Sequence, residues 1–477
     1  MATGGLPLDG SLNVPTHDLQ ETHGAAVGGT TEGHMANDTP RPSLGLAACT
    51  AIVIGNMVGS GFYLSPSALA PYGLLAIVFW IVMGTGAMCL GLTFARLARR
   101  MPATGGPYAY TRAAYGDFAG FIVAWGYWIS IWSSLPLIAV AFTGSLLKLV
   151  PGLEGNRPVA VAITLGAIWL VTLANLRGVR EAGIFAEITT YAKLVPFAAI
   201  ALLGLPFVDL KHFAVFNPSG ESLVAASAAL APLTMFAYLG LESATVPAGD
   251  VRNPERTIPL STIVGIAVAA LLYVLGTTVV LGVLPREQLV ASVAPFADAA
   301  RAMWGGWAAG VVSIAVMISS LGALNGWTLL MGQVPMAAAK DKLFPDLFAR
   351  VSARHVPAIG ITLSSALATG LVLVQLSGGP GFAAVYTTLV SLATMTAVIP
   401  YVFCSLADGL ISRAGAVGLP HIGLVEAVAF AFSIFTVYGC GPTPVLWGLL
   451  LLLFGIPVYV WQRHERADAP VAAHRTR

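Results

Sequence analysis

Long apolar stretches recur along almost the whole chain, and they limit how it can fold. A membrane-crossing helix needs about 20 predominantly apolar residues. We mark twelve such stretches, near residues 44–70, 73–95, 117–149, 158–176, 184–207, 223–248, 258–284, 306–338, 357–376, 383–410, 423–439 and 444–462. Charged residues make up only 10% of the chain, against about 25% in an average soluble domain. Because lipid offers no partner to an unpaired backbone group, the sequence predicts an all-α integral membrane protein with twelve transmembrane helices.

The scarcity of charged and metal-binding side chains excludes several classes of function. A net charge of +2 leaves no basic face that would neutralise a run of phosphates, so we expect no nucleic-acid partner. The four cysteines have no CxxC spacing, and the eight histidines lie in tails or near predicted helix ends. We therefore expect neither a metal nor a cofactor. No pair of nucleophile and base appears in a loop, so the chain is not expected to be an enzyme.

Two terminal tails frame the predicted membrane region. Residues 1–43 lack hydrophobic periodicity and the charged and apolar regions of a signal peptide, so we expect a disordered tail. With this tail in the cytoplasm, 18 of the 24 Lys and Arg residues fall in cytoplasmic segments and five on the opposite side, while Lys193 stays inside a span. This distribution follows the positive-inside rule, and it predicts that both termini are cytoplasmic.

The first predicted helix contains a signal for a break inside the membrane. Gly59-Ser60-Gly61 combines little side-chain bulk with low helix propensity, so local unwinding would free backbone N–H groups. Such groups, at the positive end of a helix dipole, suit a carboxylate. Gly55 and Gly59 also make a GxxxG spacing, which usually means close helix packing. Taken alone, this segment leaves both interpretations open.

The sixth predicted helix carries a matching signal. Gly240, Glu242 and Pro247 follow one another inside an apolar run. Interrupted segments at corresponding places, five spans apart, are typical of the binding site of an inverted-repeat transporter. A charged acid at mid-bilayer costs about 2.5–3.5 kcal/mol and usually faces a cavity. We expect Glu242 to exchange a proton for a cation and so to couple pH to transport; the alternative is a protonated acid in a structural hydrogen bond to unwound backbone.

Lys193 is the second charge that falls inside a predicted helix. We expect its ammonium to occupy the place of a bound cation and to hold the unwound part of the first helix to the fifth. The alternative is that it snorkels to the cytoplasmic interface, since it lies only about ten residues into the span. Four aromatic residues also lie in spans, where packing and anchoring are the commonest roles; they are Tyr127, Phe236, Trp327 and Tyr401.

Five motifs make a specific resemblance to a known family. They are Asn56 to Phe62, Gly240 to Ala244, Asp250 to Arg256, Ala294 to Arg301 and Gly326 to Leu330. Through them the chain, from about residue 44 to 463, resembles bacterial members of the amino acid, polyamine and organocation transporter superfamily. Within this superfamily it is most similar to the basic amino acid/polyamine antiporters, such as arginine/agmatine exchangers.

The resemblance implies the fold shared by sodium-coupled and amino acid transporters. In that fold two inverted repeats of five helices form the core, the first and sixth helices are broken, and two further helices are peripheral. The implied segments are a tail at 1–43, the first repeat at 44–208, the second at 209–410, the peripheral spans at 411–463 and a tail at 464–477. The resemblance also implies a bacterial inner membrane, a small-molecule amino acid or amine as partner, and leaves a homodimer open.

At matched positions the resemblance implies roles for individual residues. Ser60 and Gly61 would bind the substrate carboxylate, and Glu242 would sense protons. The implied substrate-binding set is Asn56, Ser60, Gly61, Phe236, Leu239, Trp327 and Ala393. The implied gating residues are Tyr127, Phe236 and Tyr401, and those implied in proton sensing or coupling are Glu242 and Lys193.

A few positions depart from the antiporter pattern. Leu135 and Ile138 stand where the antiporters carry polar or thioether groups, and Ala393 replaces a serine, so the distal pocket is more apolar than arginine would favour. Lys193 resembles a lysine of proton-coupled amino acid transporters. The leading hypothesis is exchange of an external basic amino acid, such as arginine or lysine, for an internal amine or amino acid. The alternative is proton-coupled uptake of a neutral amino acid that uses Lys193.

Overall fold

The described part of the chain is helical. The computed structural model describes residues 44–102, 105–153, 155–178, 194–354, 356–377, 382–411 and 422–468, so the predicted tail at 1–43 and Lys193 lie outside it. Its α-helices are α1 (Leu46–Met57), α2 (Ser60–Tyr63), α3 (Ser65–Leu69), α4 (Leu74–Arg100), α5 (Pro107–Tyr115), α6 (Asp117–Leu149), α7 (Arg157–Arg177), α9 (Leu223–Tyr238), α10 (Pro254–Val283), α11 (Arg286–Val290), α12 (Pro295–Trp304), α13 (Gly306–Lys340), α14 (Ala358–Ser377), α15 (Phe382–Ile411), α16 (Leu424–Gly439), α17 (Pro442–Leu453) and α18 (Gly455–Asp468). In these residues the β-structure is a single isolated bridge between Leu44 and Val251.

The helices occupy the predicted apolar stretches. Eight of the described helices are long and apolar enough to cross a membrane. Shorter apolar helices, at Leu46–Met57, Leu194–Leu203, Ala358–Val374 and Leu424–Gly439, fall in the remaining stretches. The prediction of an all-helical membrane protein is thus confirmed for the described residues, while the number of twelve crossings and the inverted repeat stay predictions.

Two of the described α-helices, α7 and α9, begin with a side-chain cap. The Asn156 side chain accepts a hydrogen bond from Val159 N at the start of α7, and Ser222 does the same for Ala225 N at the start of α9. These side chains satisfy N–H groups that the first turn leaves without partners. At α6, Asp117 in the first turn adds a negative charge that the helix dipole favours.

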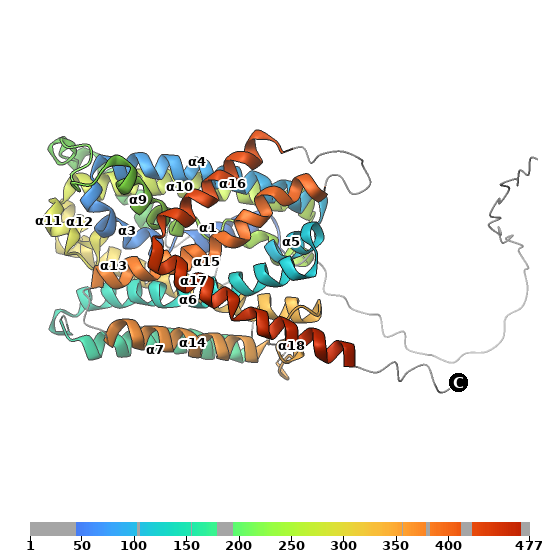
Figure 1. Cartoon of the computed structure of the whole chain (residues 1–477). Helices are drawn as coiled ribbons and strands as arrows, with labels where there is room; N and C mark the ends of the chain where they lie inside the picture. Colours follow the sequence, from blue (N-terminus) through green and yellow to red (C-terminus); the bar gives the residue numbers. More distant parts are fainter. Residues whose placement is uncertain are drawn as a thin grey trace, which may run out of the picture. The chain divides into compact units, whose positions relative to one another are not determined.

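Helix α6 lies at the centre of the bundle. Its most apolar segment is 89% buried, whereas that of Pro442–His464 is only 17% buried and therefore lies at the outside of the bundle. α6 packs mainly on α13 and α15, α4 packs on α10, and α7 packs on α14. In Figure 1, α4 and α10 run along one edge and α7 and α14 along the opposite edge, with α6, α13 and α15 between them. Every functional segment described below contacts this central group.

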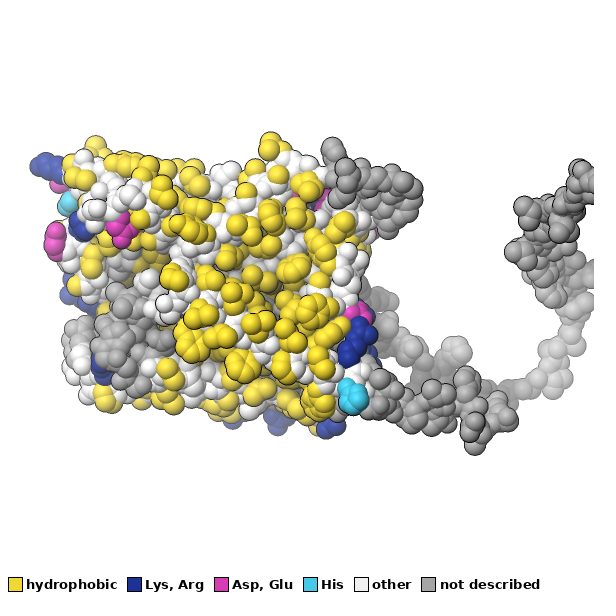
Figure 2. All heavy atoms as spheres, viewed as in Figure 1, with side chains coloured by type: hydrophobic (Ala, Val, Ile, Leu, Met, Phe, Trp, Pro, Cys, Tyr) yellow, Lys and Arg dark blue, Asp and Glu magenta, His cyan; other side chains and the backbone are white. Residues whose placement is uncertain are grey.

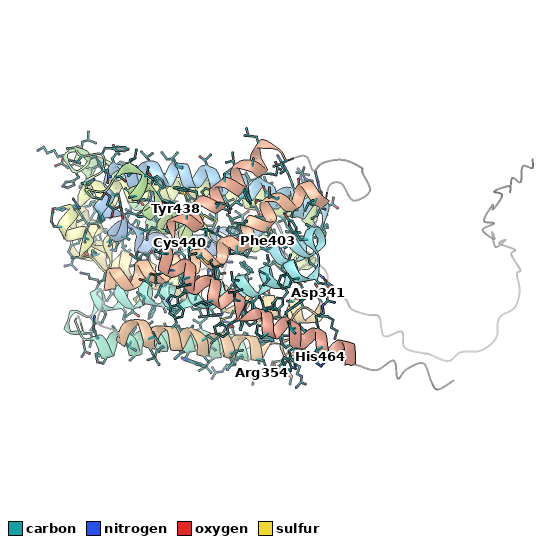
Figure 3. All side chains as sticks on the ribbon, in the orientation of Figure 1. Asp341, Arg354, Phe403, Tyr438, Cys440 and His464 are labelled. Atoms are coloured by element: carbon teal, nitrogen blue, oxygen red, sulfur yellow. The ribbon has the colours of Figure 1, made fainter. Side chains whose placement is uncertain are left out.

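Charged side chains gather toward the two ends of the helices. The face in Figure 2 is covered mostly by hydrophobic side chains, and the Lys, Arg, Asp and Glu visible on it lie mainly at its two ends. Asp341 and Arg354 come from one segment predicted to be cytoplasmic and His464 comes from another, and Figure 3 places all three at the same end. We call this the predicted cytoplasmic end; which side it faces in the cell stays a prediction.

The close approach of α4 to α16 yields a test of this packing. A Cβ added at Gly86 would lie 2.0 Å from the Phe432 ring, whereas one at Gly310 on α13 meets nothing within 4 Å. We expect Gly86→Ala to destabilise the protein by about 1–3 kcal/mol through overpacking, seen as a lower midpoint of thermal unfolding in detergent. Gly310→Ala is the matched control and should leave the midpoint unchanged or raise it. Equal midpoints for the two variants would contradict this packing.

Candidate functional site

The first predicted helix is interrupted near its middle. α1 ends at Met57, Val58 leaves the helical region with φ −78° and ψ 87°, and α2 begins at Ser60. The break therefore lies at Val58 and Gly59, slightly before the Gly59-Ser60-Gly61 run in which the sequence predicts it. Gly59 also packs on α13, since a Cβ added to it would lie 3.5 Å from Ala323. Close packing and interruption thus occur together at this glycine.

The second interruption follows α9. Leu239 is extended, with φ −62° and ψ 138°, and Gly240 has a φ of +99°. That conformation is strained for any residue with a Cβ, which explains why glycine stands there. The chain then turns and continues in the short 3-10 helix η5 (Ser243–Thr245). The predicted break in this helix is confirmed.

The two interruptions meet. Asn56 Nδ2 donates a hydrogen bond to Ser243 Oγ at 2.9 Å, which joins α1 to η5. Gly326 on α13 leaves room for the same amide, since a Cβ there would lie 2.5 Å from Asn56 Oδ1. A Cβ on Gly61 would lie 2.9 Å from atoms of Phe236 and Ala237, so α2 rests directly on the end of α9.

A cavity lies at this meeting point. In this structure the cavity is small, with a volume of about 10 Å³. The lining residues are Asn56, Met57, Gly59, Gly61, Ser134, Ile138, Phe236, Leu239, Ala323 and Trp327. Trp327 and Phe236 are almost fully buried, and the lining side chains carry no formal charge. The wall is therefore aromatic and aliphatic, with few polar groups.

The structure brings most of the expected substrate-binding residues together at this cavity. Asn56, Gly61, Phe236, Leu239 and Trp327 all line it. Ala393 is buried on α15 but is not among the described lining residues, and its carbonyl accepts a hydrogen bond from Thr396. The backbone of Ser60 is in α2, and its side chain lies outside what the structure describes. Roles for all of these residues stay proposals.

The sequence missed part of the α6 wall. Ile138 lines the cavity as a departure from the antiporter pattern, but Leu135 does not line it among the described residues, and Ser134 does. α6 is apolar and buried on nearly every side, so its sequence has no amphipathic period that would show which side chain faces the centre. Only packing against α2 and α13 selects Ser134.

Glu242 lies beside the second interruption in a fully buried position. The Tyr127 hydroxyl donates to its Oε1 at 2.5 Å, and the Tyr401 hydroxyl donates to its Oε2. Both carboxylate oxygens therefore accept hydrogen bonds from phenols, one on α6 and one on α15. The residues expected to gate and the residue expected to sense protons form one cluster, which we call the acid–phenol cluster: Tyr127, Glu242 and Tyr401.

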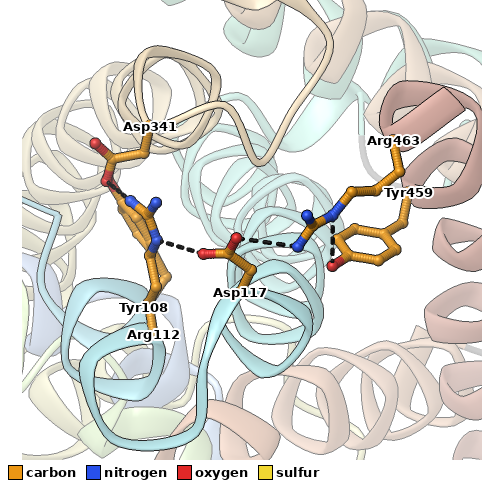
Figure 4. A network of polar contacts seen from close by, with 6 residues as sticks. All are labelled: Tyr108, Arg112, Asp117, Asp341, Tyr459 and Arg463. Carbon is orange, nitrogen blue, oxygen red and sulfur yellow. Dashed lines mark hydrogen bonds and ion pairs between the residues drawn. The ribbon is translucent and has the colours of Figure 1, made fainter. Parts of the chain in front are cut away.

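Helix α5 lies between the acid–phenol cluster and the predicted cytoplasmic end. Gly105 N, just before α5, donates to Val246 O at 3.1 Å, and Thr111 on α5 contacts Cys404 on α15. Through Tyr108 and Arg112, α5 also joins a network of charges, which Figure 4 shows. The network consists of Tyr108, Arg112, Asp117, Asp341, Tyr459 and Arg463.

Shared carboxylates hold this network together. Arg112 pairs with Asp117 at 2.9 Å and with Asp341 at 3.3 Å, and Arg463 reaches Asp117 from the other side at 3.0 Å. The hydrogen bond from Arg112 to Asp117 raises the pKa of the guanidinium above its ordinary value. The guanidinium thus stays charged, and the network ties α5 to α6, α13 and α18. Each pair is partly exposed, so its individual contribution is small.

Contacts also bridge the opposite end. Lys148 at the end of α6 pairs with Asp298 on α12 at 3.4 Å, and Asp298 accepts a hydrogen bond from Ser292 at 2.5 Å. Ser67 on α3 donates to the carbonyl of Ser292 at 2.8 Å. A chain of contacts therefore runs from α6 to α3 across this end. The cavity lies between two bridged ends.

Interrupted helices that meet around a central cavity in an apolar helical bundle define a membrane transport protein. Residues 44–459 match the family described as amino acid permease, and the chain belongs to this family.

Curated relatives extend the comparison over nearly the whole chain. The "Cadaverine/lysine antiporter" of Escherichia coli (strain K12) is 31% identical over 436 residues, which cover 90% of this chain and 97% of the relative. The "Putrescine transporter PotE" of the same organism is 28% identical over 421 residues, covering 87% and 95%. The protein of that name from Haemophilus influenzae (strain ATCC 51907 / DSM 11121 / KW20 / Rd) is 29% identical, covering 87% and 96%. The prediction of a superfamily transporter is confirmed.

The acid–phenol cluster yields a prediction for stability. Removing one phenol leaves a buried carboxylate oxygen without its donor, which costs about 1–3 kcal/mol. We expect Tyr127→Phe to lower the unfolding midpoint in detergent. Tyr127→Phe introduced into the Glu242→Gln variant should lower the midpoint less than it does in the unchanged protein. The two residues are in direct contact, so the effects of their replacement are not additive.

Tyr386 provides the matched control. Its hydroxyl is buried and has no partner among the described residues, so Tyr386→Phe should not lower the midpoint. A loss for Tyr386→Phe as large as that for Tyr127→Phe would show that the bond to Glu242 is not the cause.

Proposed function

We propose that this chain is a secondary antiporter of the bacterial inner membrane. In this proposal it exchanges an external basic amino acid, such as lysine or arginine, for an internal amine or amino acid by alternating access. The observation that carries it is the cavity between the two interrupted helices, joined by the bond from Asn56 to Ser243. The relatives are named for putrescine transport and for cadaverine/lysine antiport, which supports this class of substrate.

The substrate's carboxylate would bind at the first interruption. The Gly61 N–H lies in the first turn of α2, and the described residues hold no partner for it. Unpaired N–H groups at such a position suit an anion. Ser60 would contribute in the same way through its backbone, and Asn56 would bind close to it. Trp327, Phe236, Leu239 and, more remotely, Ala393 would contact the rest of the substrate.

Gating and proton sensing would belong to the groups around Glu242. Phe236 would act as an aromatic lid over the cavity, and Tyr127 and Tyr401 would gate the path beyond it. Glu242 would report pH, because gain or loss of its proton changes what the two phenols can donate to. A coupling role for Lys193 and the cytoplasmic position of both termini remain part of the proposal on sequence grounds.

One observation favours a second candidate function. The described lining of the cavity carries no acidic side chain, and Ile138 extends its apolar wall. A neutral amino acid would fit such a wall without burying a second charge. The second candidate is therefore proton-coupled uptake of a neutral amino acid.

Exchange in liposomes tests the proposal. Purified protein should take up labelled lysine at least about tenfold faster into vesicles preloaded with lysine or cadaverine than into empty vesicles. The reason is that the binding site of an antiporter returns to the outer side only with an internal substrate bound. Vesicles without protein measure leakage. Equal uptake into empty vesicles would exclude exchange. Accumulation of a neutral amino acid in empty vesicles under an imposed pH gradient would favour the second candidate instead.

Replacement of Glu242 tests the proton-sensing role. Glutamine keeps an acceptor oxygen but cannot titrate, so Glu242→Gln should bring the ratio of exchange rates at pH about 5 and about 8 close to one. Glu287→Gln changes an exposed acid on α11 and should retain the pH dependence of the unchanged protein. If Glu242→Gln is folded and active but follows the original pH profile, the sensor is another group.

A further inference from the structure

Ser134 contributes the one hydroxyl group among the described side chains that line the cavity. Its Oγ donates to the carbonyl of Ser130, one turn earlier on α6, at 2.7 Å. A serine hydroxyl has a single proton and two lone pairs. Since the proton is already used inside the helix, Ser134 can only accept a hydrogen bond from a ligand in the cavity.

The rest of the wall offers little to a group rich in donors. The described lining contains no carboxylate, and both oxygens of Glu242 accept from tyrosines. Asn56 turns its Oδ1 toward Gly326 on α13. Among the described lining side chains, what remains is the Ser134 oxygen and the two aromatic rings of Phe236 and Trp327.

This set of groups distinguishes between the side-chain cations of the two basic amino acids, the ammonium of lysine and the guanidinium of arginine. A guanidinium carries five donors in a planar fork and needs several acceptors in one plane, whereas an ammonium is compact and carries three. An aromatic ring attracts either cation, but a single acceptor leaves most of a guanidinium's donors unpaired in a buried site, which is costly. The wall therefore suits an ammonium better.

We propose that Ser134 is a specificity-determining residue that accepts a hydrogen bond from the substrate's terminal ammonium, so that the cavity takes primary amines in preference to guanidinium compounds. The inference rests on the proposed function, because it assumes that the substrate enters this cavity. Within that function it selects lysine-like substrates over arginine.

Binding of three amino acids to the purified full-length protein tests the inference. L-Lysine, L-arginine and L-norleucine have similar chains and end in an ammonium, a guanidinium and a methyl group. By calorimetric titration, lysine should bind about tenfold or more tightly than either of the others, the scale of one charged hydrogen bond. Ser134→Ala should lower the affinity for lysine about tenfold and leave the affinity for norleucine unchanged.

Two further variants separate specificity from structure. Ser133→Ala removes a neighbouring buried hydroxyl that also donates to Ser130 O, at 3.2 Å, but is not among the described lining residues; it should leave lysine affinity unchanged. Ser134→Cys keeps the size with a weaker acceptor and should bind lysine with intermediate affinity, which guards against a folding defect in the alanine variant.

The outcomes that overturn the inference are distinct from failure of the proposed function. Arginine or norleucine binding as tightly as lysine would overturn the role of Ser134 alone, as would equal weakening of all three ligands in Ser134→Ala. Absence of binding by all three to the unchanged protein would overturn the proposed function and this inference with it.

Discussion

The hydrogen bond between Asn56 and Ser243 joins the two places where membrane helices are interrupted. An interrupted helix leaves backbone groups without partners, and lipid supplies none. Such breaks are stable only where protein encloses them, and here α13 and α6 complete the enclosure through Gly326 and Ser134. The cavity is therefore the space that two mutually supporting breaks create in the middle of an otherwise regular bundle.

The polar contacts of the protein are distributed in three layers along the helices. The network around Arg112 bridges one end, the contacts from Lys148 through Asp298 to Ser67 bridge the other, and the acid–phenol cluster lies between the first of these and the cavity. The end contacts are partly exposed and individually weak. The buried cluster is costly to disturb, because its carboxylate has no water to replace a lost donor. Weak bridges at both ends around a firmly held centre are compatible with the alternating access that we propose.

The family and the cavity give different kinds of information about the substrate. Membership of the amino acid permease family defines a transporter, but fold alone does not select a ligand. In our proposal the cavity wall adds that selection through one acceptor on Ser134, two aromatic rings and an absence of charge among its described side chains. Ile138, which departs from the antiporter pattern, and Ser134 are therefore the positions that we propose set this chain's substrate range.

The sequence alone determined the helical class, the positions of the apolar helices and both interruptions, because hydrophobic length and glycine are local properties. The family resemblance also pointed to Asn56, Phe236, Leu239 and Trp327, which the structure brings to one cavity. Tertiary structure decided the partners. Tyr127 and Tyr401 reach Glu242 from 115 and 159 residues away, and Ser134 rather than Leu135 faces the centre. Nothing in a uniformly apolar helix marks the side that meets its neighbours, so only the packing of distant segments could select them.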